Sequence, residues 1–464
     1  SAPPPAWAQE AEPGATACNR GWYDVLRRED IAPEGVIATD DEVWIAGGSL
    51  LGGGRRQAAV LRLTDTDALL ELPPAPETRD SGFMGLSETP DGERFWAVGF
   101  GREVDFVAAY AARRGDDGWD ESEAFRPNGF NAALTDVDAS PTQGTWAAGF
   151  LQGSPGDQRP WVLERGGGDW QASEPPIADD ERATLAGVSV SDEGGVWIAG
   201  TAHADPAMVP YLAVRADGGW TRHRVTDVEG AALADIDVPA VDRGWAVGHR
   251  PVGGTIEPLV LRWDGQAWSV DEGPALGPGP TLLTSVTDVA DVVSVGGTTW
   301  DAERHRYVPI AARRDADGEW AVSVGRRGWG MGTVTDVAGD PGAGGWLVGR
   351  VDDGLAARIC DAPVESLATP EEAFAASAPA APEQPGQSGA AGPLEGDVVA
   401  VDVTKAAGLP AASQSWGAVA ADFDNDGDDD LFLGRHGARA RLFINDGGTF
   451  VESEQRFGGG DRHA

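Results

Sequence analysis

Lysine, cysteine and long hydrophobic runs are scarce in this sequence. Lys405 is the only lysine among 464 residues, and Cys18 and Cys360 are the only cysteines. A membrane-spanning helix needs about 18 or more consecutive apolar residues, and no such run occurs, so membrane insertion is not expected. Asp and Glu number 75 against 35 Lys and Arg, which gives a formal net charge of −40. Such a chain repels nucleic acid and anionic lipid, and neither is an expected partner.

Catalytic motifs are missing as well. The sequence has no nucleophile elbow, no phosphate-binding loop and no Cys/His cluster. Its six histidines show no metal-ligand spacing, and its four tyrosines stand in no context typical of a tyrosine nucleophile. The sequence therefore predicts no catalytic residues and a protein that is not an enzyme.

One short motif is present seven times. Its clearest copy is Gly-Trp-Ala-Val-Gly at 244–248, and the copies follow one another about every 50 residues. A constant period of this length is typical of a repeat array. The sixth copy is degenerate, and we align Val293 with its tryptophan position. The other six copies carry the tryptophans Trp44, Trp96, Trp146, Trp197, Trp245 and Trp346.

Each repeat divides into four short segments with strand character. In the fifth repeat, Leu233–Val238 alternates apolar and polar residues, and two β-rich segments follow, Trp245–Gly248 and Pro258–Trp263. An Asp264-Gly265 turn then leads into Trp268–Val270. Four strands per unit without helical periodicity are typical of one blade of a β-propeller. The sequence thus predicts an all-β fold, a seven-bladed β-propeller.

The recurring tryptophans have two interpretations. Large apolar residues at a fixed place in every blade are typical of packing between neighbouring sheets, which is the interpretation we favour. The alternative is a stacking platform for sugars or bases. The glycine after each motif indicates a place where the backbone passes close to its neighbour.

The seventh repeat lacks its fourth strand. Its first three strands correspond to 334–338, 346–349 and 355–360, and no tryptophan strand follows Asp361. Near the other end of the chain, Asn19–Val25 matches the fourth-strand pattern. We therefore expect the N-terminal segment to close the ring beside the third strand of the last blade, which removes an open sheet edge.

The two cysteines fit this closure. Alignment on the fifth repeat places Cys360 at Trp263 and Cys18 at Asp264, neighbours across a turn. A Cys18–Cys360 disulfide would replace the missing hairpin link, and its loop of roughly 340 residues corresponds to about 5 kcal/mol at most in the chain-entropy model. Two free buried thiols are the alternative.

Acidic residues recur in the expected innermost strands. Strand alternation puts their side chains on one face, with Val137, Ile236 and Val337 on the other. They would line the central channel, either as a hydrated acidic surface, which we favour, or as a cation site. These residues are Asp136, Asp138, Asp235, Asp237 and Asp336.

Composition divides the chain into four parts. Residues 1–17 form an Ala/Pro/Glu-rich tail, expected to be disordered, which resembles what remains after removal of an export signal. The propeller spans 18–361. A Pro/Ala-rich linker covers 362–397, and a different unit occupies 398–464.

The last unit contains a candidate calcium loop within Asp422–Asp430. Carboxylates at positions 1, 3, 5 and 9 with glycine at position 6 suit a hard cation bound by oxygen ligands, and position 7 offers its backbone carbonyl. An EF-hand requires Glu at position 12, where Leu433 stands, and the flanks have strand character, so a β-hairpin loop is expected. An acidic turn without an ion is the alternative. The predicted Ca²⁺ ligands are Asp422, Asp424, Asp426, Asp428 and Asp430.

Residues 398–455 resemble an FG-GAP/VCBS repeat of the integrin type. The phrases Val401-Asp402-Val403-Thr404 and Asp422-Phe423-Asp424-Asn425-Asp426-Gly427 are similar to the cartilage-acidic-protein group. The resemblance implies blade loops that hold Ca²⁺, a second seven-bladed propeller, and a secreted or adhesive protein. Only one such loop is present, so the unit would be part of an incomplete second propeller, completed by another chain or by a missing C-terminal region. The first propeller resembles, more loosely, the Trp-Ala-Val-Gly repeats of exported bacterial proteins.

These features predict a secreted or cell-surface protein of the extracellular space or cell envelope. We expect it to bind calcium and to act in adhesion or in protein/glycan interaction, with an unknown protein or glycan ligand. Loops such as Gly48–Gln57 and Ala202–Met208 would present the binding surface. Two alternatives are an extracellular carbohydrate-active hydrolase or lyase that uses the propeller face, and a structural subunit of a surface assembly or filament.

Overall fold

A computed structural model represents the chain in two compact units, 1–380 and 381–464, each described here by itself. The described residues are 415–421, 430–435, 441–446, 449–453 and 22–359 without 29, 40–41, 52–54, 65–67, 74–79, 90–94, 116–117, 154–156, 179–180, 194, 205–206, 227, 277–278, 302–305, 315–317, 325–331, 341–343 and 352. Within these ranges, no helix has the length and apolar character needed to cross a membrane.

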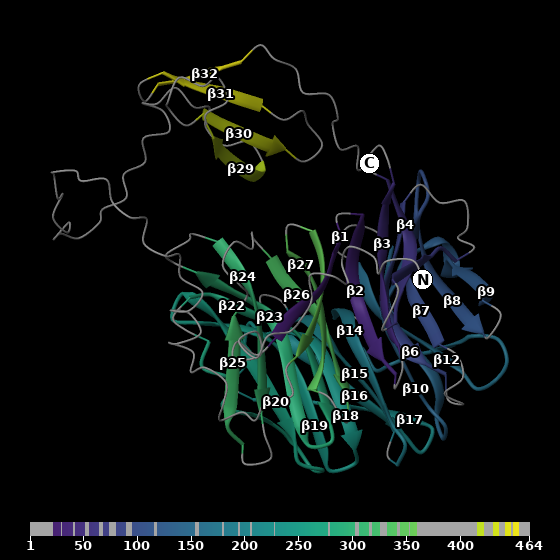
Figure 1. Cartoon of the computed structure of the whole chain (residues 1–464). Helices are drawn as coiled ribbons and strands as arrows, with labels where there is room; N and C mark the ends of the chain where they lie inside the picture. Colours follow the sequence, from purple (N-terminus) through teal and green to yellow (C-terminus); the bar gives the residue numbers. More distant parts are fainter. Residues whose placement is uncertain are drawn as a thin grey trace, which may run out of the picture. The chain divides into compact units, whose positions relative to one another are not determined.

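The first unit is built from four-stranded antiparallel sheets, the blades, whose strands are numbered first to fourth from the channel outward (Figure 1). Blade one consists of β2 (Ile31–Ala38), β3 (Val43–Leu51), β4 (Arg55–Leu63) and β5 (Ala68–Glu71). Blade two consists of β6 (Asp80–Glu88), β7 (Phe95–Arg102), β8 (Val107–Gly115) and β9 (Gly118–Phe125). Blade three consists of β10 (Asn131–Ser140), β11 (Gly144–Gln152), β12 (Gln158–Arg165) and β13 (Gln171–Ser173). Blade four consists of β14 (Arg182–Ser191), β15 (Gly195–Ala204), β16 (Ala207–Ala216) and β17 (Gly219–His223). Blade five consists of β18 (Ala232–Ala240), β19 (Arg243–Val252), β20 (Thr255–Trp263) and β21 (Trp268–Val270). Blade six consists of β22 (Thr281–Val289), β23 (Val292–Asp301), β24 (Arg306–Arg314) and β25 (Trp320–Val324).

Blade seven joins the two ends of the propeller. Its sheet order is β26 (Gly332–Asp340), β27 (Gly344–Val351), β28 (Asp353–Ile359) and β1 (Trp22–Arg28). Strand β1 pairs antiparallel with β28, from Trp22 opposite Ile359 to Arg28 opposite Gly354. The prediction that the N-terminal segment supplies the missing fourth strand is confirmed. The innermost strand β2 packs against both β6 and β26, so the ring of seven blades is closed.

Strand register corrects two details of the sequence alignment. In blade six, Ser294 lies opposite Arg313, as Trp245 lies opposite Arg262 in blade five, so Ser294 and not Val293 takes the tryptophan position. In blade seven, Ile359 lies opposite Gly345, as Trp263 lies opposite Gly244, so Cys360 falls one residue beyond the place we expected. In blade six two glycines are adjacent, and it is Gly297 whose Cβ would lie 2.1 Å from a carbonyl oxygen of the innermost strand, so the motif ends one residue later than Gly296. In blade seven the turn between the second and third strands is shorter, since Val351 pairs with Asp353, whereas Val252 pairs with Thr255 in blade five.

The six motif tryptophans are core residues. Their exposed fractions lie between 2% and 7%, which confirms the packing interpretation. The following glycine is required by space: a Cβ at Gly99 or Gly149 would lie 2.0 Å from a carbonyl oxygen of the innermost strand of the same blade. The predicted close backbone approach is therefore confirmed.

Arginines of the following blade cover most of these indoles. The guanidinium carbon lies 4.7 to 5.0 Å from the ring centre in four interfaces: Arg114 on Trp44, Arg165 on Trp96, Arg215 on Trp146 and Arg314 on Trp245. Between blades four and five, Trp263 replaces the arginine and lies 4.9 Å from Trp197. Cation–π contacts contribute about 0.5–2 kcal/mol each when partly desolvated. They connect consecutive blades outside the inner ring.

The second unit forms one four-stranded antiparallel sheet of β29 (Ser415–Ala421), β30 (Asp430–Arg435), β31 (Arg441–Asp446) and β32 (Thr449–Glu452). Leu442 and Phe443 are buried in it. Ala421 pairs with Asp430, so the acidic segment between them joins two antiparallel neighbours. The predicted strand character of both flanks is confirmed.

Removal of β1 tests the closure. A chain that begins at residue 29 leaves β28 as an open edge, and we expect a lower unfolding midpoint, a broader transition and aggregation, measured by circular dichroism and size-exclusion chromatography. A chain that begins at residue 17 keeps β1 and Cys18 and should behave like the full chain. Equal stability of the two truncated chains would contradict a structural role for β1.

Candidate functional site

Three channel carboxylates occupy equivalent positions on alternate blades. Asp136, Asp235 and Asp336 follow the bulge of the innermost strands β10, β18 and β26. Small residues fill this position in the blade before each of them: Gly85, Gly187 and Ser285. A Cβ at Gly85 would lie 2.9 Å from an oxygen of Asp136, and one at Gly187 would lie 2.8 Å from an oxygen of Asp235. The space that the small residue leaves therefore holds the carboxylate of the following blade.

Each of these carboxylates bonds to the backbone of the next blade. One oxygen accepts an N–H at 2.8 Å from Val188, Val286 or Val36, which lie in blades four, six and one. The other oxygen accepts the N–H of the residue that follows it in its own strand, again at 2.8 Å. The bond from Asp336 to Val36 crosses the closure of the ring.

Asp138 and Asp237 repeat the arrangement two residues later. Their carboxylates accept the N–H of Val190 at 2.7 Å and of Asp288 at 2.6 Å from the next blade. Ser87 donates its hydroxyl to Asp138, and the hydroxyl of Ser189 accepts the N–H of Val238 at 2.9 Å. All five channel aspartates therefore link blades.

Burial raises the pKa values of the five channel aspartates. Desolvation raises the pKa of Asp136 to about 8, of Asp237 to about 7, and of Asp138 and Asp336 to about 6. It also raises the pKa of Asp235 well above its ordinary value, and the facing carboxyls of Asp136 and Asp336 raise it further. The backbone N–H donors oppose these shifts without cancelling them.

The expected face of the innermost strands is confirmed. Val137, Ile236 and Val337 are buried against the neighbouring sheets, while the five aspartates keep part of their surface accessible. Among the described residues, no three acidic, histidine or cysteine side chains form a group suited to a metal ion. The hydrogen bonds give the carboxylates a structural role that sequence reasoning missed.

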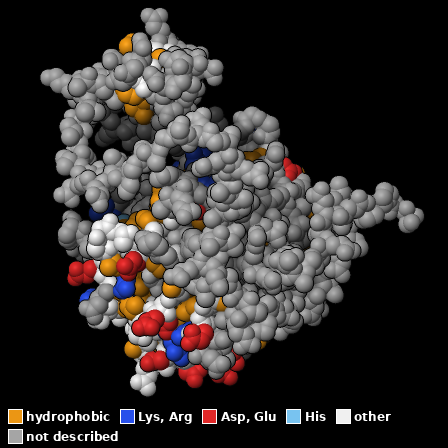
Figure 2. All heavy atoms as spheres, turned by 60° about the vertical axis from the view of Figure 1, so that its left-hand side comes forward, with side chains coloured by type: hydrophobic (Ala, Val, Ile, Leu, Met, Phe, Trp, Pro, Cys, Tyr) orange, Lys and Arg blue, Asp and Glu red, His pale blue; other side chains and the backbone are white. Residues whose placement is uncertain are grey.

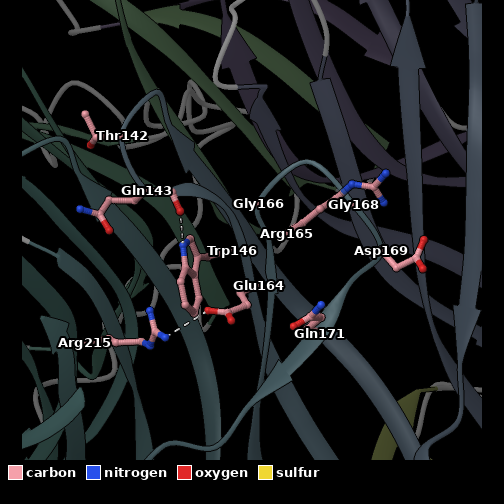
Figure 3. A pocket seen from close by; sticks show the side chains of 10 residues that line it. All are labelled: Thr142, Gln143, Trp146, Glu164, Arg165, Gly166, Gly168, Asp169, Gln171 and Arg215. Atoms are coloured by element: carbon pink, nitrogen blue, oxygen red, sulfur yellow. Dashed lines mark hydrogen bonds and ion pairs between the residues drawn. The ribbon is translucent and has the colours of Figure 1, made fainter. Parts of the chain in front are cut away.

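A separate polar pocket lies between blades three and four (Figure 3). It has a volume of about 400 Å³. Its lining comes from the turn after β10, the start of β11, the end of β12, the turn before β13, the first residue of β13, and β16 of the next blade: Thr142, Gln143, Trp146, Glu164, Arg165, Gly166, Gly168, Asp169, Gln171 and Arg215.

Trp146 and Arg215 form one wall of this pocket. The Arg215 guanidinium lies 4.9 Å from the centre of the Trp146 ring and 3.5 Å from the Glu164 carboxylate. The indole N–H of Trp146 donates to the Gln143 carbonyl at 2.9 Å. Figure 3 shows the Arg215 and Glu164 side chains directed toward each other, with Gln171 beyond them. The wall is thus held by contacts within the protein and presents polar atoms to the space.

The rim that contains this pocket is acidic. Turns between the first and second and between the third and fourth strands carry exposed carboxylates. Among the described residues, one exposed arginine lies beside them, Arg262 near the end of β20. Figure 2 shows Asp and Glu side chains gathered along the lower margin of one side of the molecule. The exposed acidic residues of these turns are Asp169, Asp192, Glu193, Asp217, Asp242, Asp264, Asp291 and Glu319.

The predicted calcium ligands and cysteines are mostly outside the described residues. Asp422, Asp424, Asp426 and Asp428 lie there, as do Cys18 and Cys360. Asp430 begins β30, and its backbone pairs with Ala421. Trp22 and Ile359, at the ends of β1 and β28, are register partners. Cys18 precedes Trp22 by four residues, and Cys360 directly follows Ile359.

Comparison with known proteins gives no family for the chain. No protein-family model and no curated protein matches the chain. Among solved structures, "YCF48 bound to D1 peptide" is similar at TM-score 0.48 and 11% identity, over 74% of this chain and 97% of that one. The β-propeller domain of Myceliophteria thermophila Cps50 (Swd1) gives 0.47 and 8%, over 72% and 99%. A structure from a study of two prolyl endopeptidases gives 0.41 and 16%, over 74% and 48%.

The channel carboxyls predict a pH dependence of stability. Because their folded-state pKa values are raised, the folded chain holds more protons than the unfolded chain between pH 4 and pH 8, roughly. Stability is then greatest below the ordinary carboxyl pKa and is lost as the pH rises through about 6 to about 8. We expect calorimetry to show an unfolding midpoint at least a few degrees lower at the upper end of this window.

Asp235→Ser provides the matched variant. Ser285 holds the equivalent position in blade six, where its hydroxyl accepts the N–H of Val337 at 3.2 Å. Serine at 235 can therefore keep a link between blades while removing one titrating group. Its stability should fall less steeply with pH. A midpoint that rises with pH in the unchanged protein would show that the channel carboxyls do not have raised pKa values.

Proposed function

We propose that this protein is a secreted or cell-surface, calcium-binding β-propeller that acts in adhesion or in protein/glycan interaction without catalysis. The observation that carries the proposal is a set of exposed aliphatic side chains at one rim. They stand at or beside the turns between second and third strands in four blades, with exposed fractions of 48% for Leu50, 77% for Val104, 38% for Met208 and 38% for Val252. Leu50 and Met208 belong to the two loops that the sequence suggested as a binding surface.

This rim differs chemically from the opposite one. Apolar side chains repeated at one exposed edge of a rigid scaffold suit contact with another macromolecule. The opposite rim is acidic and contains the polar pocket. The five channel aspartates, which would be the obvious acid–base groups, are bonded to the backbone of neighbouring blades. These features support binding at the rims in preference to chemistry in the channel.

A matched screen tests the proposal. The full chain should bind members of a glycan array or an array of extracellular proteins and should leave a panel of polysaccharides uncleaved. Leu50→Ser combined with Val104→Ser should weaken binding of a protein ligand at this rim, while Val241→Ser, also at an exposed valine, should not. Cleavage of any polysaccharide would instead support a hydrolase or lyase and would contradict the proposal.

Calcium binding rests on the acidic hairpin of the second unit. The pairing of Ala421 with Asp430 brings both ends of the loop together, as a β-hairpin that wraps a cation requires. The five aspartates supply only oxygen, the ligand that Ca²⁺ takes. This donor set fits the ion, and the resemblance to FG-GAP/VCBS repeats supports the same assignment.

Titration calorimetry on chelator-treated protein should show Ca²⁺ binding by this unit. Asp424→Asn combined with Asp426→Asn removes two charged ligands, and we expect the affinity to fall by roughly tenfold or more. Asp446→Asn, at the end of β31 and outside the loop, is the control. An unchanged affinity in the double variant would contradict the assignment.

The Cys18–Cys360 disulfide remains our proposal for the open end of the β1–β28 ribbon. Counted from the strand ends, both cysteines fall at the place that Asp264 takes in blade five. Peptide mapping without reductant should recover them as one joined peptide. Cys18→Ser should lower the free energy of unfolding by roughly 2–5 kcal/mol. Two unjoined thiols in protein prepared under oxidising conditions would refute it.

A further inference from the structure

The pocket between blades three and four lies at an interface that departs from the pattern of most others. In blades one, two, five, six and seven, the third-strand residue opposite the motif position is an arginine: Arg62, Arg113, Arg262, Arg313 and Arg358. Blade four has Val214 there. Blade three has Glu164 opposite Trp146 instead. A shorter side chain at this place leaves room that the long arginine takes elsewhere.

The carboxylate partner of the next blade's arginine has moved as well. Arg114 pairs with Glu71 of the fourth strand at 2.8 Å, and Arg165 pairs with Glu121 of the fourth strand at 2.7 Å. Arg215 finds its carboxylate one strand further in, at Glu164, and only at 3.5 Å. Gln171 stands on the fourth strand β13, paired with Glu164. The result is an open space at a place where the interfaces of Trp44 and Trp96 hold a close ion pair.

The lining leaves hydrogen-bonding groups unused. Among the described residues, the side chains of Gln143, Gln171 and Asp169 make no hydrogen bond, and all three are exposed. Glu164 has only its loose contact with Arg215. The two amides each offer a donor and an acceptor, while the two carboxylates accept. Planar groups of this kind are what a ligand with several neighbouring hydroxyls requires, because each hydroxyl both donates and accepts.

Charge and shape narrow the ligand class. The positive charge of Arg215 balances the negative charge of Glu164, so the inner wall does not favour a charged ligand. Trp146 is 3% exposed and lies beneath Arg215, so no open ring face favours an apolar ligand. A volume of about 400 Å³ is at the small end of ligand pockets, roughly 300–1,000 Å³. We propose that this pocket binds one or two units of a neutral saccharide; this rests on the glycan branch of the proposed function.

Glycines in the turn before β13 allow a sharp test. Gly166 lines the pocket, has no positive φ, and a Cβ there would meet no atom within 4 Å. Gly166→Tyr can therefore occupy the pocket without strain in the backbone. Gly219, the first residue of β17 beside the corresponding turn of blade four, is equally open and also lacks a positive φ. Gly219→Tyr is its matched control.

Binding is measured on the full chain by saturation-transfer NMR with methyl glycosides of neutral hexoses and N-acetylhexosamines. Agmatine, a cation, and glucuronate, an anion, are tested in the same way as charged ligands for comparison. We expect transfer to at least one neutral glycoside and its loss in Gly166→Tyr. Gln143→Ala combined with Gln171→Ala should weaken binding about tenfold, since two hydrogen bonds are lost. Gly219→Tyr and Gln266→Ala, in the exposed turn of blade five, should bind as the unchanged protein does.

Three results would overturn the inference: no transfer to any neutral glycoside, preference for agmatine or glucuronate, or neutral binding that Gly166→Tyr leaves intact. Thermal unfolding of each variant identifies loss of fold, and the double alanine variant keeps the test valid if the tyrosine variant does not fold. If arrays still reveal glycan or protein ligands in these cases, the proposed function stands while the pocket assignment fails. If neither the arrays nor the NMR measurement detects a ligand, both the proposed function and the pocket assignment fail.

Discussion

The propeller depends on hydrogen bonds between the aspartate carboxylates of one innermost strand and the backbone N–H groups of the innermost strand in the next blade. A carboxylate buried without partners would be costly, but four of the five channel aspartates accept two backbone N–H groups, one of them from the neighbouring blade. The fifth, Asp237, accepts one backbone N–H from the neighbouring blade and the Ser189 hydroxyl. Threonines add to the link, since Thr135 donates to the Leu185 carbonyl at 3.1 Å. The same devices cross from blade seven to blade one, where Asp336 reaches Val36 and Thr335 reaches Pro33. The ring is therefore closed by side chains at its centre as well as by β1 at its edge.

The outer layer depends on arginine for a reason of geometry. A planar guanidinium can lie over an indole and at the same time bond to a carboxylate in its own plane, which the single ammonium of lysine cannot do. Arg114 does both, over Trp44 and with two hydrogen bonds to Glu71 at 2.8 and 3.0 Å. Its pair is only 18% and 13% exposed, whereas the Arg159–Asp157 pair is 60% and 38% exposed. Exposed pairs contribute about 0–1 kcal/mol, so the interior pairs matter more.

Much of the fold was predictable because its determinants are local and repeated. The regular spacing of the tryptophans predicted the number of blades. The absence of a fourth-strand pattern after Asp361 indicated that the segment around Trp22 supplies the fourth strand of the last blade. Strand registers were less accessible, because two adjacent glycines in blade six and a shorter turn in blade seven placed Val293 and Cys360 one position away from their true equivalents. The role of the channel aspartates depends on atoms about 50 residues away in the chain. The pocket left only one signal in the sequence, Glu164 at a position where five other blades have arginine. That signal has a meaning only once the strands are paired.

That pocket illustrates how a propeller can acquire a binding site without a change in its core. Glu164 and Gln171 lie outside the inner ring, and neither bonds to an innermost strand. Trp146 stays buried and keeps its contact with Arg215, so the stacked layer between the blades survives the substitution. What changes is only the position of one carboxylate and the length of one side chain. Because the backbone bonds at the channel hold the blades together, the outer positions of each interface are free to differ, and the chemistry of a rim can vary blade by blade on an unchanged frame.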